Sequence, residues 1–356
     1  MELLSEDMRR NFLAGQVIPA LPLALTEERR LDERRQRAVI RYYIDAGVGG
    51  IAVGVHSTQF EIRNPEHGLF LPLMRLASET IDGWSTRKEH APMKIAGVIG
   101  GTEQALAEAR AAAGLGYHAA LVSLAGFDRA SNEELLDHCR AISAVLPLIG
   151  FYLQPAVGGR ILDLGFWRGF AEIENVIGAK IAPFNRYRTF DVVRAVCEVG
   201  REREIALYTG NDDNILVDLL TPYQIRTDSG IRRTRIVGGL LGQWGVWTER
   251  AVELLRQVRR LVSEERPLPQ ALLGRAVEIT DANAAIFDAA HEFAGVIPGI
   301  HEILRRQGLF AGTWCLDPRL TLSAGQAEEI DRVYRDYPDL NDDAFVRENL
   351  ARWLAD

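Results

Sequence analysis

The chain has 356 residues, of which 47% are hydrophobic and 25% are charged, and its formal net charge is −8. These proportions are those of an ordinary soluble globular protein. The acidic balance gives no reason to expect nucleic acid or an acidic membrane as a partner, and no apolar run approaches the ~18 residues that span a membrane.

The cysteines and the amino terminus bear on the cellular compartment. Cys139, Cys197 and Cys315 are isolated from one another and show no metal-ligand spacing, which is typical of a reducing compartment. Residues 1–7 carry acids and lack the apolar segment of a signal peptide. We therefore expect a cytoplasmic protein.

Short apolar runs alternate with amphipathic helical patterns along most of the chain. The runs begin near Val17, Gly50, Lys94, Ala119, Leu148, Ile177, Ile205 and Ile236. Residues 103–113 and 132–145 have helical patterns, and Ser131 with Glu134 predicts a capping box at the start of the second. Continuous apolar runs are typical of parallel strands covered by helices, so the pattern predicts eight βα units of about 30 residues each.

Eight βα units favour a (β/α)8 TIM barrel over a doubly wound sheet. The segment 97–101 is rich in glycine but lacks the GxGxxG spacing of a dinucleotide-binding sheet. A helix over 248–264 is expected to close the barrel. Further helices are predicted over 268–291, 299–307 and 324–337. We therefore predict a barrel over residues 1–265 and a C-terminal helical appendage over residues 266–356.

Lysine is rare in this chain. Lysine and arginine together number 41, but the lysines are only Lys88, Lys94 and Lys180. Lys180 sits in the apolar segment 176–182, which has the pattern of a strand. A buried lysine provides an amine that can lose its proton and attack a carbonyl, which arginine cannot do. The alternative is a lysine whose side chain extends from the strand end into solvent.

The active sites of such barrels lie at the C-terminal ends of the strands. Tyr152 ends the fifth predicted strand and Lys180 the sixth. A tyrosine beside a lysine amine suits proton transfer during imine formation, and the alternative is a rim aromatic whose hydroxyl has another partner. The other polar candidates at strand ends are His56, Ser57 and Thr58 after the second strand, and Gly210, Asp212 and Asp213 after the seventh.

Segments at five strands carry a resemblance to a known family. They are residues 18–23, 46–54, 95–100, 151–155 and 178–180. With them the chain resembles, over roughly residues 17–261, the dihydrodipicolinate synthase / N-acetylneuraminate lyase family of Schiff-base aldolases. The resemblance implies an imine between Lys180 and a 2-oxo acid, and proton transfer by Tyr152, with no metal and no organic cofactor.

The resemblance also implies where the substrate binds. The loop after Gly54 is expected to hold the carboxylate of the 2-oxo acid through the hydroxyls of Ser57 and Thr58 and through backbone N–H groups. His56 either joins them or relays a proton; a plain rim histidine is the alternative. Asp212 and Asp213 lie where sugar-acid lyases of the family bind substrate hydroxyls, although acids at a barrel rim are often only solvated.

Three positions depart from the family pattern. Val55 and Phe127 replace the two hydroxyl-bearing residues that complete the proton relay, and Arg160 is displaced from the arginine position, which aligns near Val157. We therefore do not expect dihydrodipicolinate synthase activity itself.

The sequence predicts a class I lyase or aldolase that forms or cleaves a carbon–carbon bond of a 2-oxo acid. A dehydratase of a keto-deoxy sugar acid, acting by the same imine chemistry, is one alternative, and a non-catalytic barrel that binds a 2-oxo acid is another. We expect a homo-oligomer, either a dimer or a tetramer. The cluster Arg232-Arg233-Thr234-Arg235 is expected to form a solvated face or an oligomer contact.

Overall fold

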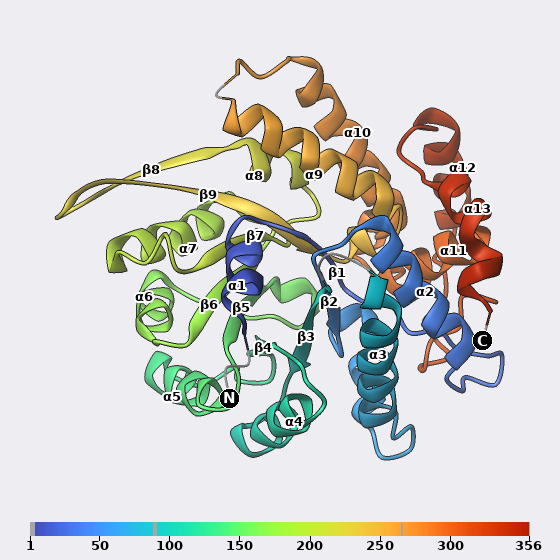
Figure 1. Cartoon of the computed structure of the whole chain (residues 1–356), viewed down its shortest axis with the longest axis horizontal. Helices are drawn as coiled ribbons and strands as arrows, with labels where there is room; N and C mark the ends of the chain where they lie inside the picture. Colours follow the sequence, from blue (N-terminus) through green and yellow to red (C-terminus); the bar gives the residue numbers. More distant parts are fainter. Residues whose placement is uncertain (1–3, 88–90, 265, 356) are drawn as a thin grey trace. The chain divides into compact units, whose positions relative to one another are not determined.

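A computed structural model describes residues 4–87, 91–264 and 266–355 (Figure 1). The chain divides into two compact units. Unit 1 comprises Met1–Gln16 and Met93–Leu240, and unit 2 comprises Val17–Pro92 and Leu241–Asp356. The predicted boundary at residue 265 stays a prediction, because that residue lies outside the described ranges, as does Lys88.

Strands and helices alternate in the order of a (β/α)8 TIM barrel with C-terminal helices, which confirms the predicted fold class. The strands of the described residues are β1 (Val17–Pro19), β2 (Gly50–Val53), β3 (Met93–Val98), β4 (Ala119–Ser123), β5 (Leu148–Leu153), β6 (Val176–Ala182), β7 (Ala206–Thr209), β8 (Pro222–Thr227) and β9 (Gly230–Leu241). The α-helices are α1 (Glu6–Leu13), α2 (Glu33–Ala46), α3 (Phe70–Trp84), α4 (Thr102–Gly114), α5 (Asn132–Ser143), α6 (Leu164–Glu172), α7 (Arg186–Val199), α8 (Ile215–Leu220), α9 (Thr248–Ser263), α10 (Ala271–Ile286), α11 (Val296–Arg306), α12 (Gln326–Asp336) and α13 (Asp343–Trp353). Short 3-10 helices are η1 (His56–Thr58), η2 (Phe60–Arg63), η3 (Ser85–Arg87), η4 (Pro155–Val157), η5 (Gln243–Gly245) and η6 (Ala289–His291).

Unit 1 is built on a parallel sheet in the strand order β3-β4-β5-β6-β7-β9. Every residue of β3 to β7 is buried, which explains why the sequence of these strands is continuously apolar. Helices α4 to α7 lie side by side along the sheet (Figure 1). Helix α5 begins with the predicted capping box, in which Ser131 and Glu134 each accept a hydrogen bond from the backbone N–H of the other.

The end of unit 1 contains a β-hairpin that was not predicted from the sequence. The last barrel strand was predicted to start near Ile236, but β9 starts at Gly230, and its first half pairs with β8 in antiparallel register. The two strands extend away from the sheet as a ribbon (Figure 1). We call this ribbon, residues 222–235, the arm.

Unit 2 holds β1, β2 and the C-terminal helices. The predicted helices over 299–307 and 324–337 are α11 and α12 with shifted ends, and the region 268–291 contains α10 followed by η6. Helix α13 was not predicted. Within the described ranges, no helix is both long and apolar enough to cross a membrane.

Candidate active site

Lys180 lies on β6 among unit 1 side chains and is only 7% exposed. In the sheet register it is flanked by Phe151 on β5 and Tyr208 on β7. Its Nζ atom lies 4.2 Å from the centroid of the Phe151 ring, so the ammonium form faces the negative face of an aromatic ring. The alternative of a lysine that extends into solvent is therefore not supported.

Phe12 of α1 packs on the face of the sheet that carries Lys180. Two residues before the lysine, Gly178 leaves the space that the Phe12 ring occupies: a Cβ atom there would lie 3.0 Å from Phe12 Cε1. Phe12 stacks on Tyr208 with ring centroids 4.7 Å apart, and the Tyr208 hydroxyl donates to the Phe12 carbonyl at 2.7 Å. This packing closes the sheet face on the N-terminal side of Lys180.

The loop after β7 lies against the lysine side chain. Gly210 donates its N–H to the carbonyl of Ile181 at 2.7 Å. A Cβ atom at Gly210 would lie 2.8 Å from Lys180 Cε and 2.8 Å from Ala182 Cβ, so the glycine makes room for the lysine. Asp212 donates its N–H back to the Gly210 carbonyl at 3.1 Å, and its side chain is buried close enough to interact with the lysine charge.

Burial lowers the pKa of Lys180 to about 8, and the negative charge of Asp212 opposes part of that shift. At a pKa of about 8, roughly one amine in ten is neutral at pH 7, against roughly one in three thousand for an exposed lysine. The neutral amine is the nucleophilic form. The site therefore supplies a reactive amine near neutral pH.

The structure does not bring the Tyr152 hydroxyl to Lys180, and its predicted proton-transfer role stays a prediction. Tyr152 pairs with Ile181, one residue beyond the lysine, and neighbouring residues of a strand point to opposite faces. Its ring packs on Trp167 of α6 with centroids 5.5 Å apart, and its hydroxyl accepts the Leu162 N–H at 3.2 Å. Burial raises the pKa of this hydroxyl. In this structure the Tyr152 side chain thus lies on the helix-facing side of the sheet.

A β-bulge explains this placement. Leu148 pairs with Val176, which is the 28-residue spacing that would set Tyr152 beside Lys180. The next pair is Ile149 with Gly178, so Ile177 is an extra residue on β6. A register shift of one residue reverses which side chain faces the lysine, and Phe151 takes the place expected for Tyr152.

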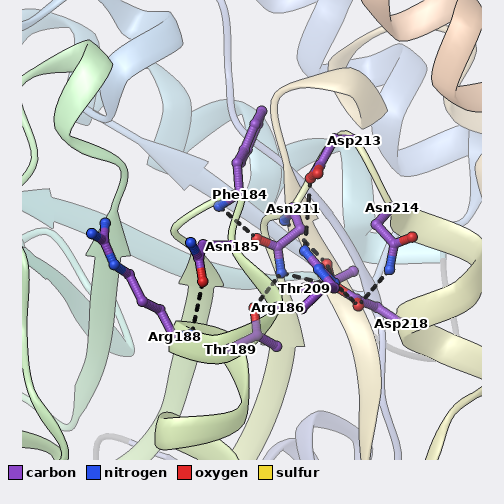
Figure 2. A network of polar contacts seen from close by, with 10 residues as sticks. All are labelled: Phe184, Asn185, Arg186, Arg188, Thr189, Thr209, Asn211, Asp213, Asn214 and Asp218. Atoms are coloured by element: carbon purple, nitrogen blue, oxygen red, sulfur yellow. Dashed lines mark hydrogen bonds and ion pairs between the residues drawn. The ribbon is translucent and has the colours of Figure 1, made fainter.

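A buried polar network anchors the loop that carries Asp212 (Figure 2). Its centre is Asp218 of α8, whose carboxylate accepts hydrogen bonds from Thr209 at 2.7 Å, from Asn211 at 2.9 Å and from Asn214 at 3.0 Å. Arg186 of α7 also pairs with this carboxylate. Because four donors converge on one buried acid, the segment from 209 to 214 is held in a fixed conformation.

The same network ties the loops after β6 and β7 together. Asn211 accepts the backbone N–H of Phe184 at 3.0 Å and donates to the Thr189 hydroxyl at 3.2 Å (Figure 2). The sequence reading did not identify Asn211, Arg186 or Asp218. The only signal for this network in the sequence is the group of polar residues after the seventh apolar run. That group does not reveal which side chain the hydrogen bonds converge on.

Asp212 and Asp213 have different surroundings. Asp213 lies 3.8 Å from Arg186, and burial raises the pKa of its carboxyl group. Asp212 instead interacts with Lys180. Substrate binding by Asp212, Asp213 and Gly210 stays a prediction, and the structure distinguishes the two acids by their partners.

The loop after β2 belongs to unit 2 and has a tight internal structure. The Thr58 hydroxyl donates to the Leu21 carbonyl at 2.6 Å and accepts the N–H groups of Gly54 and Val55 at 3.1 and 3.2 Å. The Ser57 hydroxyl donates to the Ala20 carbonyl at 3.1 Å. Backbone carbonyls thus accept both hydroxyl protons in this structure, and the predicted donation to a substrate carboxylate stays a prediction.

Of the remaining candidates, His56 lies edge-on to Phe60 with centroids 5.9 Å apart, and its predicted role stays a prediction. Arg160 donates to the backbone carbonyls of Phe127 and Ala130, the latter at 3.2 Å. Phe127 itself packs on His138 of α5, with centroids 4.7 Å apart. Arg160 therefore secures the loop after β4.

Sequence comparison adds independent information. Residues 13–222 match the family described as Dihydrodipicolinate synthetase family. The 4-hydroxy-tetrahydrodipicolinate synthase of Thiobacillus denitrificans is 28% identical over 206 residues, which is 56% of this chain and 64% of that protein. The same enzyme of Azoarcus sp. is 29% identical over 217 residues, 58% of this chain and 67% of that protein. The match thus spans less than two thirds of the Thiobacillus relative.

Solved structures share the fold at low sequence identity. N-acetylneuraminate lyase from Fusobacterium nucleatum has a TM-score of 0.67 at 19% identity, covering 91% of this chain and 99% of that chain. YagE, a prophage protein of E. coli K12 solved in complex with pyruvate, has a TM-score of 0.71 at 18% identity, covering 90% of this chain and 98% of that chain. The shared fold and the match over residues 13–222 together show that the chain belongs to the dihydrodipicolinate synthetase family.

Proposed function

We propose that this chain is a class I lyase or aldolase in which Lys180 forms a Schiff base with a 2-oxo acid. The observation that carries the proposal is the environment of the lysine: a buried amine with a pKa of about 8, at the end of a barrel strand, in a chain with few lysines. Family membership supports it, since relatives include enzymes named as synthases and lyases and one protein solved with pyruvate.

The proposed chemistry follows from the neutral amine. The Lys180 nitrogen adds to the carbonyl carbon of the 2-oxo acid, and the resulting carbinolamine loses water to give a protonated imine. A base removes the proton of the hydroxyl group on the carbon that becomes the aldehyde. The carbon–carbon bond then breaks, the imine accepts its electron pair to become an enamine, and the aldehyde leaves. Protonation of the enamine carbon and hydrolysis then return the amine. The Phe151 ring lies where it favours the cationic imine.

Asp212 is the proposed proton-transfer group in place of Tyr152. The carbinolamine must gain a proton on its leaving hydroxyl group. Phe151, which is the β5 residue paired with Lys180, has no proton that it can donate. Asp212 is buried, interacts with Lys180 and sits in a loop fixed by the Asp218 network. A carboxyl group in this position can hold the proton between the amine and the departing water.

Two acids at the end of β7 favour a hydroxylated substrate over a dicarboxylate. Asp212 and Asp213 accept hydrogen bonds from hydroxyl groups and repel a second carboxylate. Arg160, the nearest arginine to the family position, is engaged by backbone carbonyls. A keto-deoxy sugar acid is therefore the substrate class we propose, with aldol cleavage or dehydration following from the same imine.

Reductive trapping tests the proposal. Borohydride in the presence of pyruvate should add one carboxyethyl group to the wild-type chain and none to Lys180→Arg. The matched control is Lys94→Arg, because Lys94 is also buried but lies at the amino end of β3. Trapping that persists in Lys180→Arg would contradict the proposal. Trapping without turnover on any hydroxylated 2-oxo acid would instead favour a barrel that binds 2-oxo acids and does not catalyse.

A further inference from the structure

Unit 2 contains a cavity that is lined by the successive helices α9 and α10, which Figure 1 shows. Its volume is about 350 Å³, which lies in the range of sites that bind small organic molecules. Among the described residues, α10 packs closely on α11 and α12 rather than on α9. The space that two successive helices usually fill with side chains is therefore left open.

The floor of this cavity is apolar. Apart from Gln243, the buried residues that line it are Trp244, Val246, Trp247, Ala251, Ile279 and Ala282. Side chains that border a void lack the van der Waals contacts of a packed core. The apolar body of a ligand would supply these contacts and would itself leave water.

Trp247 is held in an unusual conformation at the start of α9. Its backbone lies in the left-handed region, with φ 51° and ψ 39°, which a bulky residue rarely adopts. Its ring lies edge-on to Tyr334 of α12 with centroids 5.4 Å apart, and its Nε1 donates to the Tyr334 hydroxyl at 3.4 Å. Strain of this kind is concentrated at functional sites such as ligand clamps. The contacts with Tyr334 keep the indole in the cavity wall.

Charged side chains surround the mouth of the cavity in two ion pairs. Arg250 pairs with Glu253 at 2.7 Å, and Arg275 pairs with Asp339. In both pairs the arginine is the less exposed partner, at 41% against 52% in the first and 32% against 63% in the second. A polar group that extends from the apolar floor therefore meets guanidinium groups before carboxylates.

The arginines have donors to spare. Within the described part of the chain, Arg250 donates from Nε to the Asn341 carbonyl at 3.1 Å and from Nη1 to Glu253. A guanidinium carries five N–H donors in a planar arrangement that fits a carboxylate. The mouth can therefore bind a carboxylate without breaking these contacts.

We propose that this cavity binds a small carboxylic acid with a flat apolar body. The apolar body packs on Trp244 and Trp247, and the carboxylate binds Arg250 and Arg275. A ligand with an ammonium group is disfavoured, because that group would meet the two arginines first. The cavity is formed by unit 2 alone, whereas Lys180 belongs to unit 1, so the proposal does not depend on the Schiff-base reaction.

Isothermal titration calorimetry with 3-phenylpropionate tests the proposal. We expect a Kd on the order of 0.1–1 mM for a ligand of this size. The neutral 3-phenylpropanamide and the cationic 3-phenylpropylamine should bind at least about tenfold more weakly, because they lack the charge-assisted hydrogen bonds to the arginines.

Two variants locate the site. Arg250→Gln/Arg275→Gln should bind 3-phenylpropionate at least about tenfold more weakly. The matched control is Arg266→Gln/Arg319→Gln, which removes two arginines of unit 2 that are paired with acids but do not line the cavity. Ala282→Leu should fill part of the floor and also weaken binding. Circular dichroism checks that each variant is folded, and the charge variant decides alone if Ala282→Leu is not.

Four results would each overturn the proposal. The first is the absence of 3-phenylpropionate binding up to about 10 mM. The second is equal or tighter binding of the amide or the amine. The third is an affinity that survives in Arg250→Gln/Arg275→Gln, since the acid would then bind elsewhere. The fourth is an equal loss in the Arg266→Gln/Arg319→Gln control, which would show a general effect of charge.

Discussion

Replacing Gly210 with alanine should damage the site through a single added methyl group. The new Cβ atom would lie 2.8 Å from Lys180 Cε, 2.8 Å from Ala182 Cβ and 3.1 Å from Lys180 Cγ. Carbon atoms normally approach to about 3.5–4.0 Å, so the overlap is roughly 1 Å. The lysine side chain is flexible and can move, whereas Ala182 is fixed in the core of β6.

Two effects should follow from that overlap. Overpacking of this kind costs about 1–3 kcal/mol of folding stability. A displacement of the amine by about 1 Å should slow imine formation roughly 100-fold, because the attack on the carbonyl depends on position.

The assay is the rate of borohydride-trapped pyruvate adduct, followed by intact mass, together with a thermal melt. Gly114→Ala is the matched control, because this glycine ends α4 and a Cβ atom there meets nothing within 4 Å. If Gly210→Ala trapped pyruvate at the wild-type rate and melted like Gly114→Ala, the inferred packing of Gly210 on Lys180 would be refuted.

Four further predictions concern the site and its supports. Imine formation in the wild-type chain should rise with pH and level off above about 8, where the Lys180 amine is mostly neutral. Asp212→Asn should move this midpoint to lower pH, because it removes the negative charge that favours the ammonium form of Lys180. It should also lower turnover about 100-fold or more. A pH–rate profile checks both effects, and an unchanged midpoint would contradict the interaction between Asp212 and Lys180. Tyr152→Phe should keep turnover but lose about 1–3 kcal/mol of stability, because the buried Leu162 N–H loses its acceptor; a large fall in turnover at unchanged stability would restore the catalytic role. Asp218→Asn should cost about 1–3 kcal/mol in denaturant unfolding, because the buried donors lose a charged acceptor while the half-exposed Arg186 is solvated. A variant as stable as wild type would show that the network is not needed.

The strands were predictable because the fold imposes a pattern on them. Residues such as Ile149 and Ala120 lie in strands with helices on one side and packed side chains on the other, so no polar residue alternates with them. The arm was not predicted, because it lacks such a pattern. Its strands mix arginine, threonine and glutamine with a few apolar residues, and that composition does not separate a ribbon from a solvated loop.

The candidate site was predictable only in part. Lys180 stood out because lysine is rare in this chain and the segment around it is apolar. The assignment of Tyr152 rested on a spacing of 28 residues, and the extra residue at Ile177 cannot be recognised in an apolar run in which every residue is buried. Thr58 and Ser57 are hydroxyl-bearing residues in a suitable loop, but their hydrogen bonds to backbone carbonyls depend on three-dimensional structure.

The central claim is that the Lys180 amine itself forms the imine. The most direct measurement is peptide mapping by tandem mass spectrometry after borohydride reduction in the presence of pyruvate, since the chain offers only Lys88, Lys94, Lys180 and the amino terminus as primary amines. The account predicts one carboxyethyl group, on the peptide that contains Lys180. A modification on Lys88, on Lys94 or at the amino terminus, with Lys180 unmodified, would contradict it.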